Sequence, residues 1–210
     1  MYSIEGVVPV VHPAAFVHPT AVLIGDVHVG PRCYVGPLAS LRGDFGRIVL
    51  EEGSNLQDSC VFHTFPGTEA VLGRDGHVGH GAVLHGCVTE PGVLIGMNAV
   101  VMDDALIGAY AFVAAHSLVK AGFVVPSRTL VAGSPAKVVR TLTPAELAWK
   151  ANGTRVYQDL AERSRTSLVE VAALAQAEPD RPALSTSADV AVPLDQARAT
   201  PSEPNKRLVG

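Results

Sequence analysis

A six-residue hydrophobic repeat constrains the fold of this chain more than any other feature of its sequence. From residue 17 onward, mostly aliphatic side chains recur at every sixth position over long stretches, and glycine often follows them directly. The clearest run is Ile95, Val101, Ile107, Val113, Val119 and Val125. A helix repeats its buried face about every 3.6 residues and a half-buried strand at every second residue, so neither explains this spacing. Short strands separated by regular bends do explain it, and they predict a parallel β-helix whose coils stack aliphatic side chains inward.

The repeat resembles that of the hexapeptide-repeat superfamily, whose members form a left-handed parallel β-helix. The resemblance covers roughly residues 10–140 and includes the closing sequence Gly133-Ser134-Pro135-Ala136-Lys137. It implies an all-β fold in which residues 1–140 form a left-handed parallel β-helix. The handedness comes from this resemblance and not from the period.

A different pattern begins after residue 140. In Thr143-Pro144-Ala145-Glu146, threonine suits the N-cap, proline the first helical position and glutamate the third, which together make a capping box. We expect an α-helical segment over residues 141–175, interrupted near Asn152-Gly153-Thr154 and packed against the β-helix. Residues 176–210 contain five prolines and no aromatic residue, and we expect a disordered tail there.

Charge and composition exclude several classes of protein. The formal net charge is −4 and no block of like charges occurs, which argues against a nucleic-acid or anionic-membrane partner. The N-terminus has neither a basic region nor a cleavage-type site, and no apolar run approaches the ~18 residues of a membrane helix. The three cysteines form no C-x-x-C pair, which favours reduced, buried thiols. These features together predict a cytoplasmic protein.

Three histidines lie close together in HVGHGAVLHG, residues 77–86, but the repeat separates them. His63 and His85 each follow an inward-facing position by one residue, so we expect them near one another on one face, about one coil apart. His80 has another phase and could lie up to roughly 15 Å from His85 along an extended chain. Because zinc–nitrogen bonds are only about 2.0–2.1 Å long, we expect His80 to join His63 and His85 of a neighbouring subunit in a symmetric trimer. The alternative is that all three are surface residues without a metal, and His77 is interpreted as an exposed or supporting histidine.

The wider set of motifs resembles the gamma-class carbonic anhydrase family, in particular its subgroup associated with phenylacetate degradation and carnitine operons. The matching pieces are Arg42-Gly43-Asp44, Asn55-x-Gln57-Asp58, His63, His80-x4-His85 and Asn152-Gly153-Thr154-Arg155-x-Tyr157. The resemblance implies that His63, His80 and His85 are metal ligands. It implies that Gln57 hydrogen-bonds the metal-bound water or the substrate, and that Tyr157 faces the active site.

The same resemblance implies an intersubunit ion pair between Arg42 and Asp58, with Asp44 close to it. Three histidines with an open fourth position are typical of a catalytic zinc site, although iron, cobalt or nickel would also suit imidazole ligands. A metal of this kind lowers the pKa of bound water to about 7 and so provides a hydroxide nucleophile. We therefore predict a homotrimeric metalloenzyme with active sites at subunit interfaces. It would hydrate carbon dioxide to bicarbonate or hydrolyse an acyl-coenzyme A thioester, in phenylacetate or carnitine metabolism.

One departure from the family pattern bears on the substrate. The best-known gamma carbonic anhydrases carry a glutamate directly after the position of Asp44 and another in an acidic loop between the first two histidine ligands. Here Phe45 follows Asp44, and the short loop of residues 64–69 ends in Glu69, which we interpret as a solvated charge. This argues against fast carbon dioxide hydration.

Two other functions stay open. One is a metal-independent hexapeptide acyltransferase that uses acyl-coenzyme A and a histidine as general base. The other is a non-catalytic trimeric scaffold. Metal content distinguishes the enzyme classes.

Overall fold

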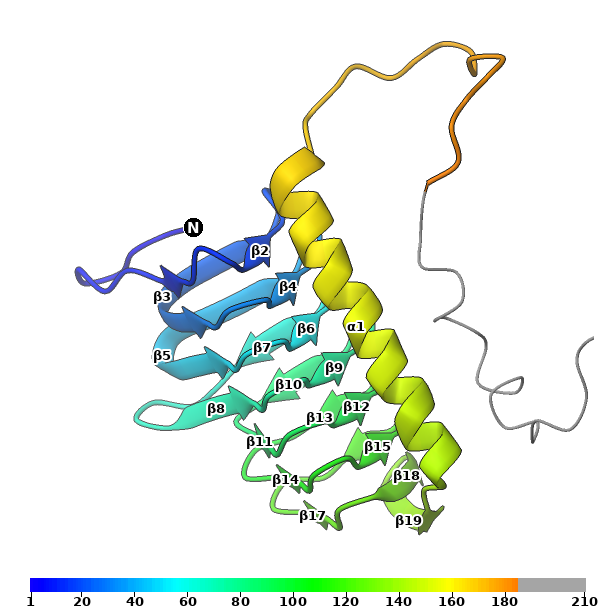
Figure 1. Cartoon of the computed structure of the whole chain (residues 1–210). Coiled ribbons are helices and arrows are strands. Elements are labelled where there is room, and N and C mark those ends of the chain that lie inside the picture. The colour runs from blue at the N-terminus through cyan, green and yellow to red at the C-terminus, as the bar shows by residue number, and fades with distance from the viewer. Residues whose placement is uncertain (185–210) are drawn as a thin grey trace, which may run out of the picture.

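The computed structural model describes residues 1–184, in which the chain winds into stacked β coils with one long helix along the side (Figure 1). The coils are built from short, mostly parallel strands that join into two sheets. The first sheet contains β1 (Val10–Val11), β3 (Val22–Val29), β5 (Ser40–Leu50), β7 (Val61–His63), β8 (Glu69–Leu72), β10 (Val83–His85), β11 (Val88–Thr89), β13 (Val100–Val101), β14 (Leu106–Ile107), β16 (Leu118–Val119) and β17 (Val124–Val125). The second contains β2 (Phe16–Val17), β4 (Tyr34–Val35), β6 (Asn55–Leu56), β9 (His77–Val78), β12 (Leu94–Ile95), β15 (Phe112–Val113), β18 (Thr129–Gly133) and β19 (Ala136–Thr141).

The long strand β5 carries the first sheet around a corner of the coil. Its residues Ser40 and Leu41 pair with β7, whereas Arg47–Leu50 pair with β8. Each coil therefore has three faces: one through β7 and β10, one through β8 and β11, and one in the second sheet. This is the parallel β-helix that the six-residue repeat predicts.

The inward positions of the repeat form one continuous core. Phe62, Leu84 and Val101 lie in register on neighbouring strands and are all completely buried. Side chains alternate between the two sides of a strand, so the residue after each inward position points outward. His63 and His85 therefore project from the β7–β10 face.

The helix α1 (Pro144–Ser167) lies along the second sheet and crosses successive coils (Figure 1). It begins with the predicted capping box, in which Thr143 accepts from the backbone N–H of Glu146 and Glu146 accepts from the backbone N–H of Thr143. The helix is not interrupted at Asn152-Gly153-Thr154, contrary to our expectation. Thr154 is buried against the coils, and this packing outweighs the low helix propensity of glycine.

The helix ends at Ser167, short of the predicted residue 175. Leu168, Val171 and Leu174 have the spacing of a helical face. All three side chains are at least half exposed, because α1 has reached the end of the coil stack (Figure 1). Without a surface to pack on, this short apolar face does not prolong the helix. Residues 168–184 contain neither helix nor strand, and the rest of the predicted tail, 185–210, lies outside the described residues. In residues 1–184, no helix has both the length and the apolar character needed to cross a bilayer.

Candidate metal centre

His63 and His85 are neighbours on adjacent coils, as their shared phase predicts. They occupy paired positions of β7 and β10, and Nδ1 of His63 lies 3.1 Å from Nε2 of His85. Two imidazole nitrogens bound to one tetrahedral zinc ion, at bonds of about 2.0–2.1 Å, would lie about 3.3 Å apart. The observed separation is therefore close to that of two ligands of one metal.

A carboxylate contacts the other ring nitrogen of each histidine. Oδ1 of Asp44 lies 3.1 Å from Nε2 of His63, and Asp103 makes a short hydrogen bond with Nδ1 of His85. If each carboxylate accepts the proton of its imidazole, then Nδ1 of His63 and Nε2 of His85 present lone pairs to one another. Two facing lone pairs at this distance repel unless a cation lies between them. The arrangement thus fits a metal, since carboxylates commonly fix the tautomer of ligating histidines in this way.

Arg42 adds positive charge beside His63. Its Nη2 lies 3.2 Å from Nε2 of His63 and its Nε lies 3.8 Å from Asp44. A guanidinium can only donate, so Arg42 and Asp44 cannot both hydrogen-bond the same ring nitrogen; we assign the proton of Nε2 to the Asp44 contact. Burial, followed by the charge of Arg42, lowers the pKa of His63, so this imidazole is neutral near pH 7.

His80 lies apart from this pair, in the turn between β9 and β10, where its Nδ1 is 3.0 Å from Asp58. About half of each of these two side chains is exposed. In residues 1–184 of a single chain, no three histidine, cysteine or acidic side chains converge in a way that could hold a metal. One chain therefore provides two neighbouring imidazoles and, at a different place, the imidazole of His80. Asp58 contacts Nδ1 of His80 and not its Nε2. The expected ion pair between Arg42 and Asp58 would join two subunits and stays a prediction, since within one chain Asp58 contacts His80.

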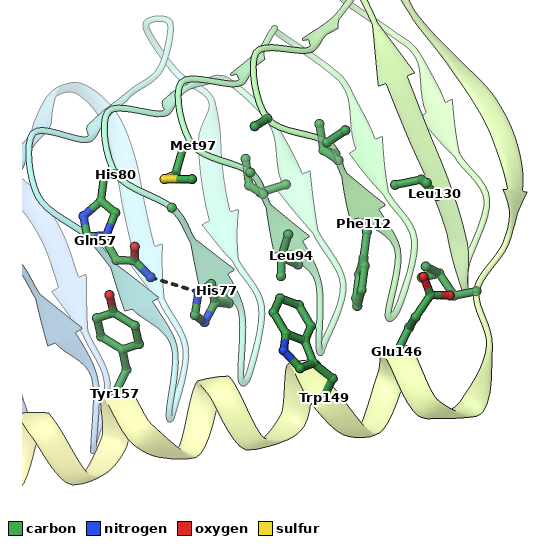
Figure 2. Close-up of a pocket in the computed structure, with 17 residues that line it drawn as sticks. Gln57, His77, His80, Leu94, Met97, Phe112, Leu130, Glu146, Trp149 and Tyr157 are labelled. Carbon is green, nitrogen blue, oxygen red and sulfur yellow. Dashed lines mark hydrogen bonds between the residues drawn. The ribbon is translucent and has the colours of Figure 1, made fainter. Parts of the chain in front are cut away.

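Gln57 lies beside His80 and contacts His77 (Figure 2). Together with Asn55 they form a polar cluster in which both amide side chains are buried and His77 is partly buried. Nε2 of Gln57 is 2.9 Å from Nε2 of His77 and donates to Oδ1 of Asn55 at 3.1 Å. Nδ2 of Asn55 is 3.2 Å from the other ring nitrogen of His77. A neutral imidazole has one donor and one acceptor, so one of the two amides must present its oxygen to the ring. His77 thereby fixes how Gln57 is turned.

The sequence alone understated the role of His77. It is enclosed by Asn55, Gln57 and the ring of Tyr157, whose centroid lies 5.3 Å away in an edge-on contact. Burial, and then the charges of Lys150 and His80, lower the pKa of His77 to about 3, so the ring is neutral. The sequence did contain one signal for this role. Asn55 and His77 each precede an inward position of the repeat, and they pair on neighbouring strands one coil apart.

Tyr157 reaches from α1 toward the same cluster (Figure 2). Burial, with a further contribution from Asp58, raises the pKa of its phenol to about 12, so the hydroxyl stays protonated at neutral pH. Tyr157 also packs edge-on against Tyr34, at 5.5 Å between ring centroids. The phenol is therefore a fixed neutral group and a poor proton acceptor.

A pocket of 490 Å³ separates α1 from the second sheet, and His80, Gln57, His77 and Tyr157 line one end of it (Figure 2). Most of the remaining lining is apolar: Leu94, Ile95, Met97, Phe112, Val113, Ala114, Ala115, Leu130, Leu142 and Trp149. The sequence predicted that the helix packs on the β-helix but gave no sign of this pocket. A ligand with a polar head and an apolar body would match it.

Two exposed phenylalanines flank the histidine pair. The ring centroid of Phe45 lies 5.2 Å from that of His63, and that of Phe65 lies 5.0 Å from that of His85. Both rings are about 55% exposed in the single chain. Glu69, in contrast, is half exposed and lies 3.8 Å from Arg47, in keeping with a solvated surface charge. The histidine pair is therefore flanked by two apolar rings in addition to the charged side chains of Arg42, Asp44 and Asp103.

Comparison with known proteins places the chain among relatives. Residues 86–121 match the family described as "Bacterial transferase hexapeptide (six repeats)". The chain is 57% identical over 189 residues to the carnitine operon protein CaiE of Salmonella agona, an alignment that covers 90% of this chain and 96% of the relative. The same values hold for CaiE of Salmonella typhimurium.

The chain belongs to the hexapeptide-repeat family. Within it, the chain groups with the carnitine operon proteins, the subgroup that its motifs predicted. Among solved structures, a hexapeptide transferase family protein from Anaplasma phagocytophilum is similar with a TM-score of 0.74 and 35% identity, over 76% of this chain and 95% of that chain. A Bacillus cereus protein assigned provisionally as an acetyltransferase is similar with a TM-score of 0.77 and 32% identity, over 79% and 96%.

Proposed function

We propose that this protein is a homotrimeric metal-dependent hydrolase whose active sites lie between subunits. His63 and His85 of one subunit and His80 of the partner subunit would hold zinc, or alternatively iron, cobalt or nickel. The observation that carries the proposal is the carboxylate on each of these imidazoles, together with the 3.1 Å separation of the facing nitrogens of His63 and His85. Carboxylates commonly orient ligating histidines in this way, and the separation of the two facing nitrogens suits two ligands of one metal.

The residues around the metal would bind and orient the substrate. When bound, the metal would acidify a water molecule and polarise a carbonyl oxygen. Asp44 and Asp103 keep the outer ring protons of His63 and His85 in place, so both ligands stay neutral and correctly oriented. Gln57, turned by His77, would hydrogen-bond the reacting oxygen, and Tyr157 would close the site as a neutral phenol.

An acyl-coenzyme A thioester is the substrate that this site favours over carbon dioxide. Carbon dioxide and bicarbonate are small, and they do not need the apolar pocket of 490 Å³ that lies beside the proposed metal ligand His80. Phe45 and Phe65 also stand where a proton-shuttling glutamate and an acidic loop would favour hydration. The Salmonella relatives are carnitine operon proteins, which supports hydrolysis of a thioester in carnitine metabolism or the related degradation of phenylacetate.

The direct test is an assay of zinc-loaded protein against carbon dioxide and against a panel of acyl-coenzyme A thioesters with short, long and aromatic acyl groups. We expect thioester hydrolysis with a preference for apolar acyl groups and slow or absent hydration. Replacement of both Phe45 and Phe65 by alanine should raise KM for the apolar acyl groups more than for acetyl. A metal-replete trimer that turns over neither substrate class would contradict the proposal.

An acyltransferase is the second candidate, because two structural relatives are described as transferases. It would require no metal and would transfer the acyl group to an acceptor other than water. Acyl transfer that persists after complete removal of metal would favour it over hydrolysis. A non-catalytic scaffold would gain support if His80→Ala abolished metal binding and left every cellular function of the protein intact.

A further inference from the structure

A second pocket, of 390 Å³, lies along the opposite edge of α1 from the apolar one. It uses a different set of helix positions, including Lys150, Thr154 and Arg155. Its other wall is a corner of the β coils, just before the strands of the second sheet begin. The candidate metal ligands and the residues of the apolar pocket do not line it.

The corner wall is built from equivalent positions of successive coils. Asp75, Gly92, Tyr110 and Arg128 each have a left-handed backbone, with φ between 54° and 73°, and each N–H donates to a carbonyl of the preceding coil. Gly92 contributes no side chain, and a Cβ there would collide with the ring of Tyr110. These four stacked positions therefore leave a hollow at Gly92, between Asp75 on one side and Tyr110 and Arg128 on the other.

Two buried polar side chains of α1 line this hollow. Lys150 is 4% exposed, and its Nζ donates to the backbone oxygen of Asp75, which uses one of its three N–H groups. Thr154 is 3% exposed, and its Oγ1 has no hydrogen-bond partner in the described structure. An unsatisfied buried hydroxyl costs free energy, so this atom calls for a partner that protein groups do not provide.

The charges of the pocket are predominantly positive. Three cations, Lys150, Arg128 and Arg155, line it against one carboxylate, that of Asp75, which accepts from Nε2 of Gln158 at 2.8 Å. Arg128 stacks over Tyr110 at 5.5 Å, and Arg155 donates to the side chain of Asn152. None of these three cations forms an ion pair within the described residues. Burial lowers the pKa of Lys150 to about 8, with Asp75 opposing the shift, so its charge is poorly compensated.

We propose that this pocket binds the phosphate group of a small molecule, with Lys150, Thr154, Arg128 and Arg155 as donors. A phosphate dianion would neutralise the excess positive charge and offer an acceptor to the hydroxyl of Thr154. Arginine guanidinium groups suit the oxygens of phosphate because they donate in a planar fork. The inference does not depend on the metal centre. The phosphate is either free or part of a larger ligand such as coenzyme A.

Calorimetric titration of the full-length protein tests the proposal with inorganic phosphate and with coenzyme A as probes, at constant ionic strength set with sodium chloride. We expect saturable binding of at least one probe. Thr154→Val, which keeps the shape but lacks the hydroxyl, should weaken it roughly tenfold, whereas Thr154→Ser should stay within about threefold of the wild type. Lys150→Met should weaken binding at least as much as Thr154→Val.

The two probes identify the source of the phosphate. Coenzyme A that binds more tightly than inorganic phosphate, and loses that advantage in Thr154→Val, identifies a coenzyme-linked phosphate. Equal affinity of the two probes identifies free phosphate. The proposal is overturned if neither probe binds, or if Thr154→Val and Lys150→Met, with circular dichroism unchanged from the wild type, bind both probes as the wild type does.

Discussion

Asp103 is the residue whose replacement tests most simply how the histidines are held. Its carboxylate contacts the outer nitrogen of His85, so Asp103→Asn removes the charge but little of the volume. We expect metal affinity to fall by about 10- to 100-fold, as is usual when such a supporting carboxylate is lost. Competition with a chromophoric chelator measures this change, and Glu69→Gln, in an exposed carboxylate, is the matched control. Equal affinity of the Asp103→Asn variant and the wild type would show that His85 needs no such support.

His77 predicts a specific dependence of stability on pH. Its pKa is about 3 in the folded protein and about 6.5 when unfolded, so on acidification the unfolded chain takes up a proton that the folded protein does not. The stability contributed by neutral His77 is thus fully present above pH 6.5 and is lost as pH falls from 6.5 toward 3. Between pH 7 and pH 5 this amounts to roughly 2 kcal/mol.

Urea unfolding at pH 7 and pH 5 measures this contribution. His77→Gln should reduce the loss between the two pH values, and His116→Gln, in an exposed histidine, should not. A pH dependence of stability that is identical in the wild type and the His77→Gln variant would mean that His77 titrates normally.

The sequence could predict some of these residues and not others, for a geometric reason. His63 and His85 share a phase of the repeat, so their contact could be predicted. The contact between His85 and Asp103 could not be predicted, because the spacing from one coil to the next changes. His63 and His85 lie 22 residues apart, whereas His85 and Asp103 lie 18 residues apart. The loop of residues 64–69 lengthens one coil, so no single spacing identifies the neighbour on the next coil.

At the scale of elements, the capping box of α1 offers a direct test of how the helix is anchored. Thr143→Ala removes the acceptor for the backbone N–H of Glu146 and should lower the free energy of unfolding by about 1 kcal/mol. Thr143→Ser keeps the acceptor and should be nearly neutral. Urea unfolding at pH 7 measures both variants, and equal stability of Thr143→Ala and Thr143→Ser would show that the cap contributes nothing.

The start of α1 could be predicted from the sequence and its course could not. The cap is a local signal of four residues, whereas continuity through Gly153 depends on burial of Thr154 against coils that are distant in sequence. The end at Ser167 depends in turn on the height of the coil stack. Local helix signals can therefore be predicted from the sequence, whereas features of a helix that depend on its packing partners cannot.

At the scale of the whole molecule, the repeat determines the architecture because its period specifies short strands separated by regular bends. The two pockets beside α1 were not predictable from it, since each combines one edge of the helix with several coils. The position of His80 has a similar explanation. The described part of a single chain brings together only part of the predicted ligand set, so the proposed site needs a second subunit to be complete.

Metal binding by mixed trimers tests the shared site most directly. A His80→Ala chain retains His63 and His85, and a His63→Ala chain retains His80. In a cyclic trimer that contains both chains, one of the three interfaces joins intact ligands from the two neighbours. We predict about one tightly bound metal ion per mixed trimer, and none of comparable affinity in either parent homotrimer. Verified mixed trimers that bind no metal, or parent homotrimers that bind it as tightly as the wild type, would contradict the account.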